Sequence, residues 1–112
     1  MPQYPAAVPI SLSSGNQLAL VNNAAIDTGV TTTTQFAVGP SGTSTGVTLM
    51  IMNSTNQTAQ GQYAPSDVAA EYQNLSGCIV PAGAALAYNL ANGWMRFTFS
   101  SAPTSGSLIV SR

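Results

Sequence analysis

The chain has almost no charge. Only 4% of its 112 residues are Asp, Glu, Lys or Arg, against about 25% in typical soluble domains. The charged residues are Asp27, Asp67, Glu71, Arg96 and Arg112, and the sequence contains neither Lys nor His. Because the net charge is −1, copies repel one another only weakly, and we expect association with other copies or with a larger protein surface. The alternative is a monomer with a neutral, hydroxyl-rich surface.

The shortage of positive charge excludes two classes of partner. Binding to nucleic acid takes several Lys or Arg side chains on one face, which two arginines cannot supply. Anionic membrane surfaces are excluded for the same reason, and no apolar run approaches the roughly 20 residues of a transmembrane helix. The N-terminus, Met1 to Pro5, lacks the basic start and apolar core of a secretory signal. We therefore expect synthesis in the cytoplasm without export.

The residues that most catalytic sites need are also missing. Without His, acid–base chemistry would fall to the only closely spaced carboxylates, Asp67 and Glu71. Acids at the start of a short helix more often stabilise its dipole, and we expect neither an enzyme nor a cofactor. The single cysteine, Cys78, cannot form a zinc site without His. Its apolar neighbours indicate a buried thiol. The alternative is an intermolecular disulfide.

What the sequence does contain is a series of short runs with β-strand character, separated by Gly, Pro, Asn and Ser. They are Gln17–Val21, Thr33–Val38, Gly46–Asn53, Cys78–Val80, Ala85–Leu90, Trp94–Ser100 and Ser107–Ser111. These runs predict an all-β, single-domain β-sandwich or jelly roll. We expect a hairpin between the last two strands, a long polar loop over 54–66, and at most one short helix near 65–72.

The first residues are expected to lie apart from this domain. Residues 1–10 contain three prolines, which fix φ and remove donors, so they predict an extended arm in front of a domain over 11–112. Tyr4, Val8 and Ile10 give the arm apolar surface for a neighbouring copy. The alternative is a frayed tail.

Two strands carry further candidate interface residues. Alternation places Met50 and Met52 opposite the apolar core-facing side of their strand, so a second covering surface is expected there. Trp94 and Arg96 share the face opposite Met95, Phe97 and Phe99, and their residue types are enriched at protein interfaces. The alternative for Trp94 is a carbohydrate site, in which the indole stacks on a sugar ring.

The C-terminal third resembles small virion proteins of tailed bacteriophages. The resemblance lies in the turn Val80-Pro81-Ala82-Gly83, the alternating segment Ala84–Leu90, and a closing pair of strands that runs from Gly93 to Val110. It implies a capsid decoration (cement) protein on the virion surface, commonly trimeric, whose partner is the major capsid protein. It brings no catalytic residues. Tail, fibre and baseplate components are similar in the same features and remain alternatives.

Overall fold

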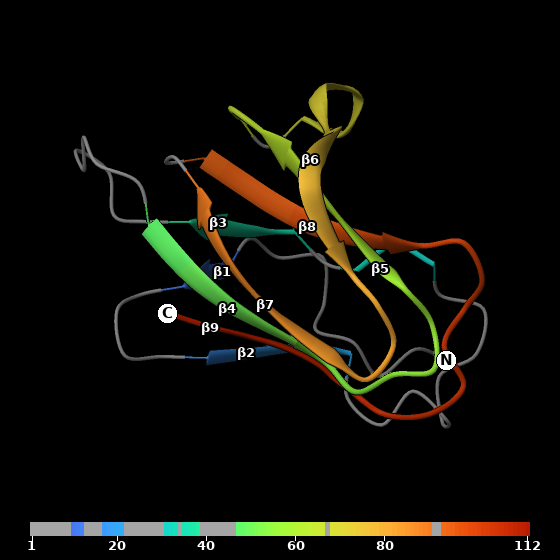
Figure 1. The fold of residues 1–112 in the computed structure, drawn as a ribbon. Coiled ribbons are helices and arrows are strands. Elements are labelled where there is room, and N and C mark those ends of the chain that lie inside the picture. The colour runs from blue at the N-terminus through green and yellow to red at the C-terminus, as the bar shows by residue number, and fades with distance from the viewer. Residues whose placement is uncertain are drawn as a thin grey trace.

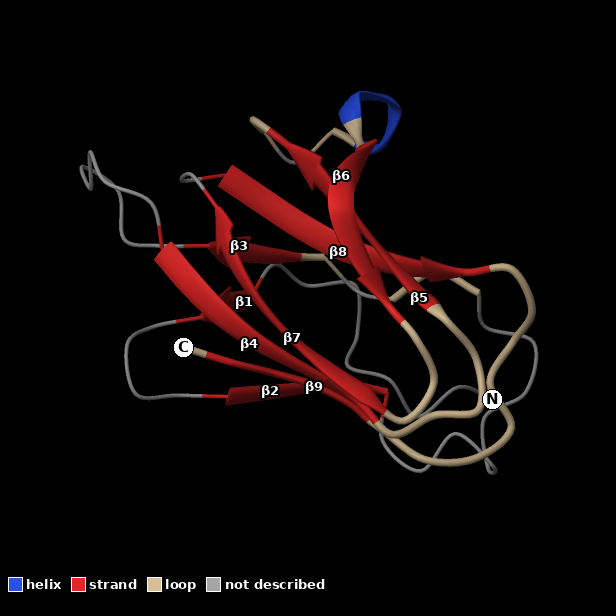
Figure 2. Ribbon diagram, in the orientation of Figure 1, coloured by secondary structure: helices blue, strands red, loops and turns tan. Residues whose placement is uncertain are grey.

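A computed structural model describes residues 10–12, 17–21, 31–33, 35–38, 47–66, 68–90 and 93–112. These ranges contain nine β-strands and one 3₁₀ helix (Figure 1, Figure 2). The elements are β1 (Ile10–Leu12), β2 (Gln17–Val21), β3 (Phe36–Val38), β4 (Val47–Asn53), β5 (Ala59–Ala64), η2 (Ala69–Glu71), β6 (Gln73–Val80), β7 (Ala84–Leu90), β8 (Gly93–Phe99) and β9 (Leu108–Ser111).

The strands form two packed sheets with jelly-roll connectivity. One sheet has the order β1-β3-β8-β5-β6, and the other has the order β2-β9-β4-β7. The antiparallel pairs β2–β9, β3–β8, β4–β7 and β5–β6 mean that the chain folds as one long hairpin, which is then wound into two layers. Among the strands that the structure describes, only β1 pairs in parallel, with β3. The predicted all-β sandwich or jelly roll is confirmed.

Alternating side chains of the central strands build the core between the sheets. Leu49 and Ile51 of β4 face Met95 and Phe97 of β8, and all four are fully buried. The period of two that defines each strand places every second side chain inside. The predicted separation of Met95, Phe97 and Phe99 from Trp94 and Arg96 is therefore confirmed, since the first three are buried and the last two are half-buried.

The predicted hairpin between the last two strands is wrong. β8 lies in the five-stranded sheet and β9 in the four-stranded sheet, so the connection over 100–107 crosses the sandwich. Sheets pack about 10 Å apart, and a connection of this length spans that gap as easily as it closes a hairpin. Neither strand carries a local signal that distinguishes the two outcomes.

The predicted loop over 54–66 contains a strand. In β5, the buried positions hold Ala59, Gly61 and Ala64, while Gln60 and Gln62 are half-buried between them. Small residues face inward because neighbours fill the space, and a Cβ at Gly61 would collide with the Sγ of Cys78. The strand therefore lacks the alternating large apolar residues by which a buried strand face is recognised in a sequence.

Two further expectations differ in extent from the structure. The short helix expected near 65–72 is a single 3₁₀ turn, η2, and Asp67 lies outside the described residues. The strand expected at Cys78–Val80 begins earlier, at Gln73, because its polar first half pairs with β5 at the sheet edge. Residues 1–9, with Tyr4 and Val8, lie outside the described part of the chain, and Ile10 opens β1.

The Cys78 thiol is predicted to be unreactive in the folded protein. Burial raises its pKa from 9.0 to about 11, although a backbone hydrogen bond from Gly61 acts in the opposite direction. At pH 8 a thiol reagent should therefore label unfolded protein quickly and folded protein only at the rate of unfolding. Because the unfolded chain ionises this thiol first, the free energy of unfolding should fall as the pH rises from 9.0 toward about 11. Equal labelling rates for folded and unfolded protein would contradict this burial.

Candidate functional site

The outer side of the four-stranded sheet carries an exposed apolar surface, which we call the methionine face. On β4, Met52 stands between Ala85 of β7 and Ile109 of β9, and Ala19 of β2 completes that row. In the next row, Met50 stands beside Ala87. The methionine face therefore comprises Ala19, Met50, Met52, Ala85, Ala87 and Ile109.

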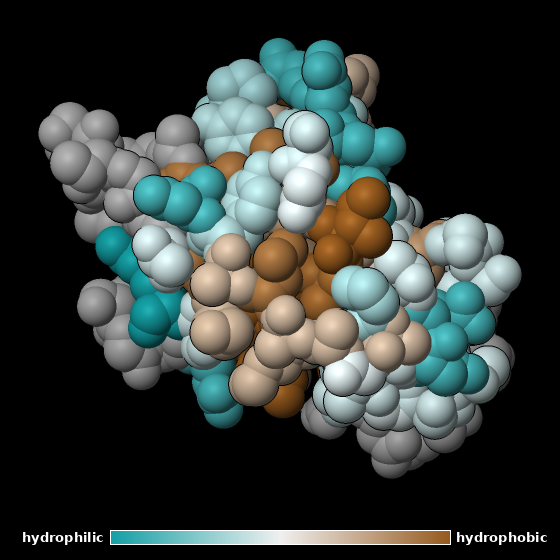
Figure 3. All heavy atoms as spheres, in the orientation of Figure 1, coloured by the Kyte–Doolittle hydropathy of each residue, from teal (hydrophilic) through white to brown (hydrophobic). Residues whose placement is uncertain are grey.

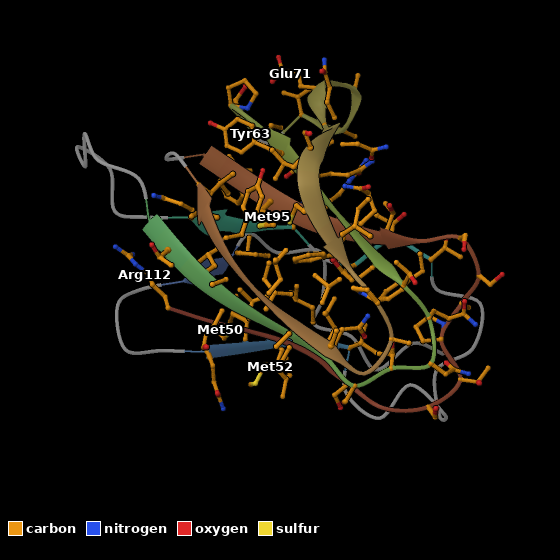
Figure 4. All side chains as sticks on the ribbon, viewed as in Figure 1. Met50, Met52, Tyr63, Glu71, Met95 and Arg112 are labelled. Carbon is orange, nitrogen blue, oxygen red and sulfur yellow. The ribbon has the colours of Figure 1, made fainter. Side chains whose placement is uncertain are left out.

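The two methionines dominate this surface. Met50 and Met52 are 43% and 42% exposed, and Figure 4 shows them projecting from β4 away from the other sheet, whereas Met95 lies between the sheets. The strand positions that form the methionine face are uncharged, and its borders are polar, with Gln17, Ser111 and Thr48, while Figure 4 shows Arg112 at the end of the sheet near Met50. In Figure 3, the tan and brown surface over β4 and β7 continues toward β6, where Ile79 is 52% exposed. Met side chains adapt readily to a partner's shape.

The outer side of the five-stranded sheet is polar and internally bonded. Arg96 donates from Nε to Oε1 of Gln62 at 2.8 Å, and Gln62 donates from Nε2 to Oδ1 of Asn74 at 2.9 Å. The Arg96 guanidinium also lies over the Tyr72 ring, 4.2 Å from its centroid. The interface role predicted for Arg96 therefore competes with contacts inside its own chain.

Two open clefts that are lined by described residues lie beside β6. The first, of about 300 Å³, is lined by Tyr63 and Glu71, which Figure 4 labels at one end of β5 and β6, and by Pro65, Gln73, Asn74 and Leu75. The second, of about 380 Å³, also includes Asn74 and extends to β8. Trp94 lines neither of these two clefts.

The structure separates the predicted interface residues. Met50 and Met52 lie on one sheet, whereas Trp94 and Arg96 lie on the outer side of the other. Ile10 is in the edge strand β1. The other residues of the methionine face come from strands whose alternation was visible in the sequence, but their alignment beside β4 depends on strand order. No sequence signal reports that order.

Three other features that bear on function concern carboxylates, metal ligands and membrane-spanning helices in the described ranges. Glu71 accepts a hydrogen bond from Ser66 Oγ at 2.7 Å. No group of three or more His, Cys, Asp or Glu residues that could hold a metal occurs among the described residues. Within the same ranges, no helix is long and apolar enough to cross a membrane.

Comparisons with known proteins leave the function to be inferred from these surfaces. No protein-family model, no curated protein and no solved structure matches the chain.

Proposed function

We propose that this protein is a structural virion protein, a capsid decoration (cement) protein that binds the capsid surface and stabilises it. The observation that carries the proposal is the methionine face, an uncharged apolar sheet surface on a compact jelly roll. A sheet that is apolar on both sides is normally covered on both sides. The occupant of this face is a protein shell whose facing surface is also apolar and uncharged, because any charge opposite Met50 and Met52 would be desolvated without a partner.

The size of the methionine face favours a repeated contact over a free dimer. The face spans four strands about 4.8 Å apart and about four residues of about 3.4 Å each, or roughly 260 Å². Stable pairs of proteins bury about 800 Å² on each partner. A contact of roughly 260 Å² is too small to hold two proteins together by itself. It can support stable binding when an oligomer presents several such faces at once to a symmetric surface, or when many copies bind that surface together.

The low charge of the chain supports the same function. Copies bound side by side on a shell lie close together, and a net charge of −1 keeps their mutual repulsion small. The resemblance to tailed-phage virion proteins favours a trimer, in which the N-terminal arm would contact a neighbouring copy. Fold alone does not separate this function from others, because jelly rolls also occur in lectins. A tail, fibre or baseplate component is the second candidate, since the same face would serve packing in those assemblies.

The test is binding to pre-formed capsids of the virus that encodes the chain. Purified protein should sediment with capsids to a saturating stoichiometry, and decorated capsids should survive higher temperature and stronger osmotic shock than bare ones. Unrelated capsids of similar size serve as the control. Sedimentation with tails or fibres but not with capsids would favour the second candidate. Failure to bind any virion part would contradict the proposal.

A further inference from the structure

The second cleft beside β6 has the lining of a binding site for uncharged polar molecules. Its volume is about 380 Å³, and it lies across the outer sides of β5, β6 and β8. The polar residues that line it are Thr58, Gln60, Asn74, Thr98 and Ser100, and the apolar residues are Ile79 and Phe99. No charged side chain lines this cleft.

A chain of hydrogen bonds determines the role of Asn74. A guanidinium only donates, so Arg96 makes Oε1 of Gln62 an acceptor and leaves the Gln62 amide as the donor to Oδ1 of Asn74. The Nδ2 group of Asn74 then has no acceptor among the described residues. Asn74, which lines the cleft, therefore keeps an amide donor, and Arg96 fixes the orientation of that amide through Gln62.

The side-chain amide of Gln60 is fixed in the opposite way to that of Asn74, with its NH₂ group bonded to the backbone. Its Nε2 lies within hydrogen-bond distance of the backbone oxygens of Gly61, Leu75 and Cys78, at 2.8, 3.1 and 3.3 Å. These oxygens only accept, so Nε2 is held toward the backbone and Oε1 is left as an acceptor. Two residues that line the cleft thus carry a preset donor, on Asn74, and a preset acceptor, on Gln60.

We propose that this cleft binds a neutral carbohydrate. A sugar hydroxyl accepts one hydrogen bond and donates another, which matches Asn74 Nδ2 and Gln60 Oε1. The hydroxyls of Thr58, Thr98 and Ser100 can donate or accept as neighbouring sugar hydroxyls require. Ile79, which is 52% exposed, offers apolar contact for the C–H groups of a sugar ring. The absence of charge from the lining disfavours sialylated, sulfated and phosphorylated glycans.

The cleft lies on the outer side of the five-stranded sheet, and the methionine face lies on the outer side of the four-stranded sheet. A molecule that docks only through the outer side of its four-stranded sheet therefore does not use the polar residues of the cleft for that contact. Carbohydrate binding does not depend on capsid binding, and the two can be lost separately.

The experiment uses the full chain and an array of neutral, sialylated and sulfated oligosaccharides. The best neutral oligosaccharide is then titrated by calorimetry into wild-type protein and three variants. Asn74→Asp keeps an acceptor for Gln62 and removes the donor, and Thr98→Val removes one hydroxyl at nearly constant volume. Asn74→Asp should weaken binding by about tenfold or more, and Thr98→Val by about threefold to tenfold. Met52→Lys, in the other sheet and outside the lining of the cleft, should leave the affinity unchanged.

Several outcomes would overturn the proposal. These are no binding of any neutral oligosaccharide at about 10 mM, preferred binding of anionic glycans, or binding only of unglycosylated peptides. Equal affinity of Asn74→Asp and wild type would show that the sugar binds elsewhere. Both cleft substitutions are at accessible positions, and thermal unfolding near the wild-type temperature would show that the folds are comparable.

Discussion

Replacing Met50 and Met52 together with Lys is expected to abolish capsid binding while leaving the jelly roll folded. Both side chains are more than two-fifths exposed, so the new ammonium groups remain hydrated in the free protein. In the bound state they would lose that water against an apolar surface, and burying even one unpaired charge costs several kcal/mol. We expect capsid affinity to fall by about 100-fold or more, measured by co-sedimentation over a range of concentrations.

A matched variant separates this local effect from net charge. Gln73→Lys with Ser76→Lys adds the same charge at exposed positions of β6, on the edge of the other sheet. This control should bind capsids nearly as well as wild type. Equal losses in the two variants would mean that overall charge controls binding. Undiminished binding by the Met50/Met52 variant would show that the methionine face is not the docking surface.

Replacing Asn53 with Ala is expected to destabilise the fold by about 3 kcal/mol, because it leaves several polar groups without partners. The side chain is 1% exposed, and its Nδ2 donates to the backbone oxygens of Gln57 and Val80, both at 2.8 Å. Its Oδ1 accepts from N and Oγ1 of Thr55 at 3.0 and 2.6 Å. Asn53 thus ties the segment after β4 to the end of β6. A loss of this size should lower the unfolding temperature by about 10 °C or more.

Asn56 provides the control for this prediction. It bonds Thr104 through both amide atoms, with Nδ2 to Oγ1 at 2.8 Å and Oδ1 to N at 2.9 Å, but its side chain is exposed. Water can replace its lost bonds, so Asn56→Ala should cost about 1 kcal/mol or less. Urea denaturation of both variants measures the difference. If the two substitutions cost the same, the buried bonds of Asn53 do not hold these loops together.

The sequence by itself determined the fold class, the core-facing residues of several strands, and the scarcity of charge. The alternation in Val47–Asn53, Gly93–Phe99 and Leu108–Ser111 is local, since each residue's side follows from the pleat of its own strand. These conclusions needed no knowledge of which strands are neighbours.

Only the tertiary structure decided which strands lie side by side. It identified β5, whose inward residues are too small to show alternation, and placed β8 and β9 in different sheets. It also separated Met50 and Met52 from Trp94 and Arg96, and brought Gln60, Asn74 and Thr98 together from three strands. The physical reason is that strand pairing depends on contacts between residues far apart in the chain, while periodicity and turn residues report only on neighbours in sequence.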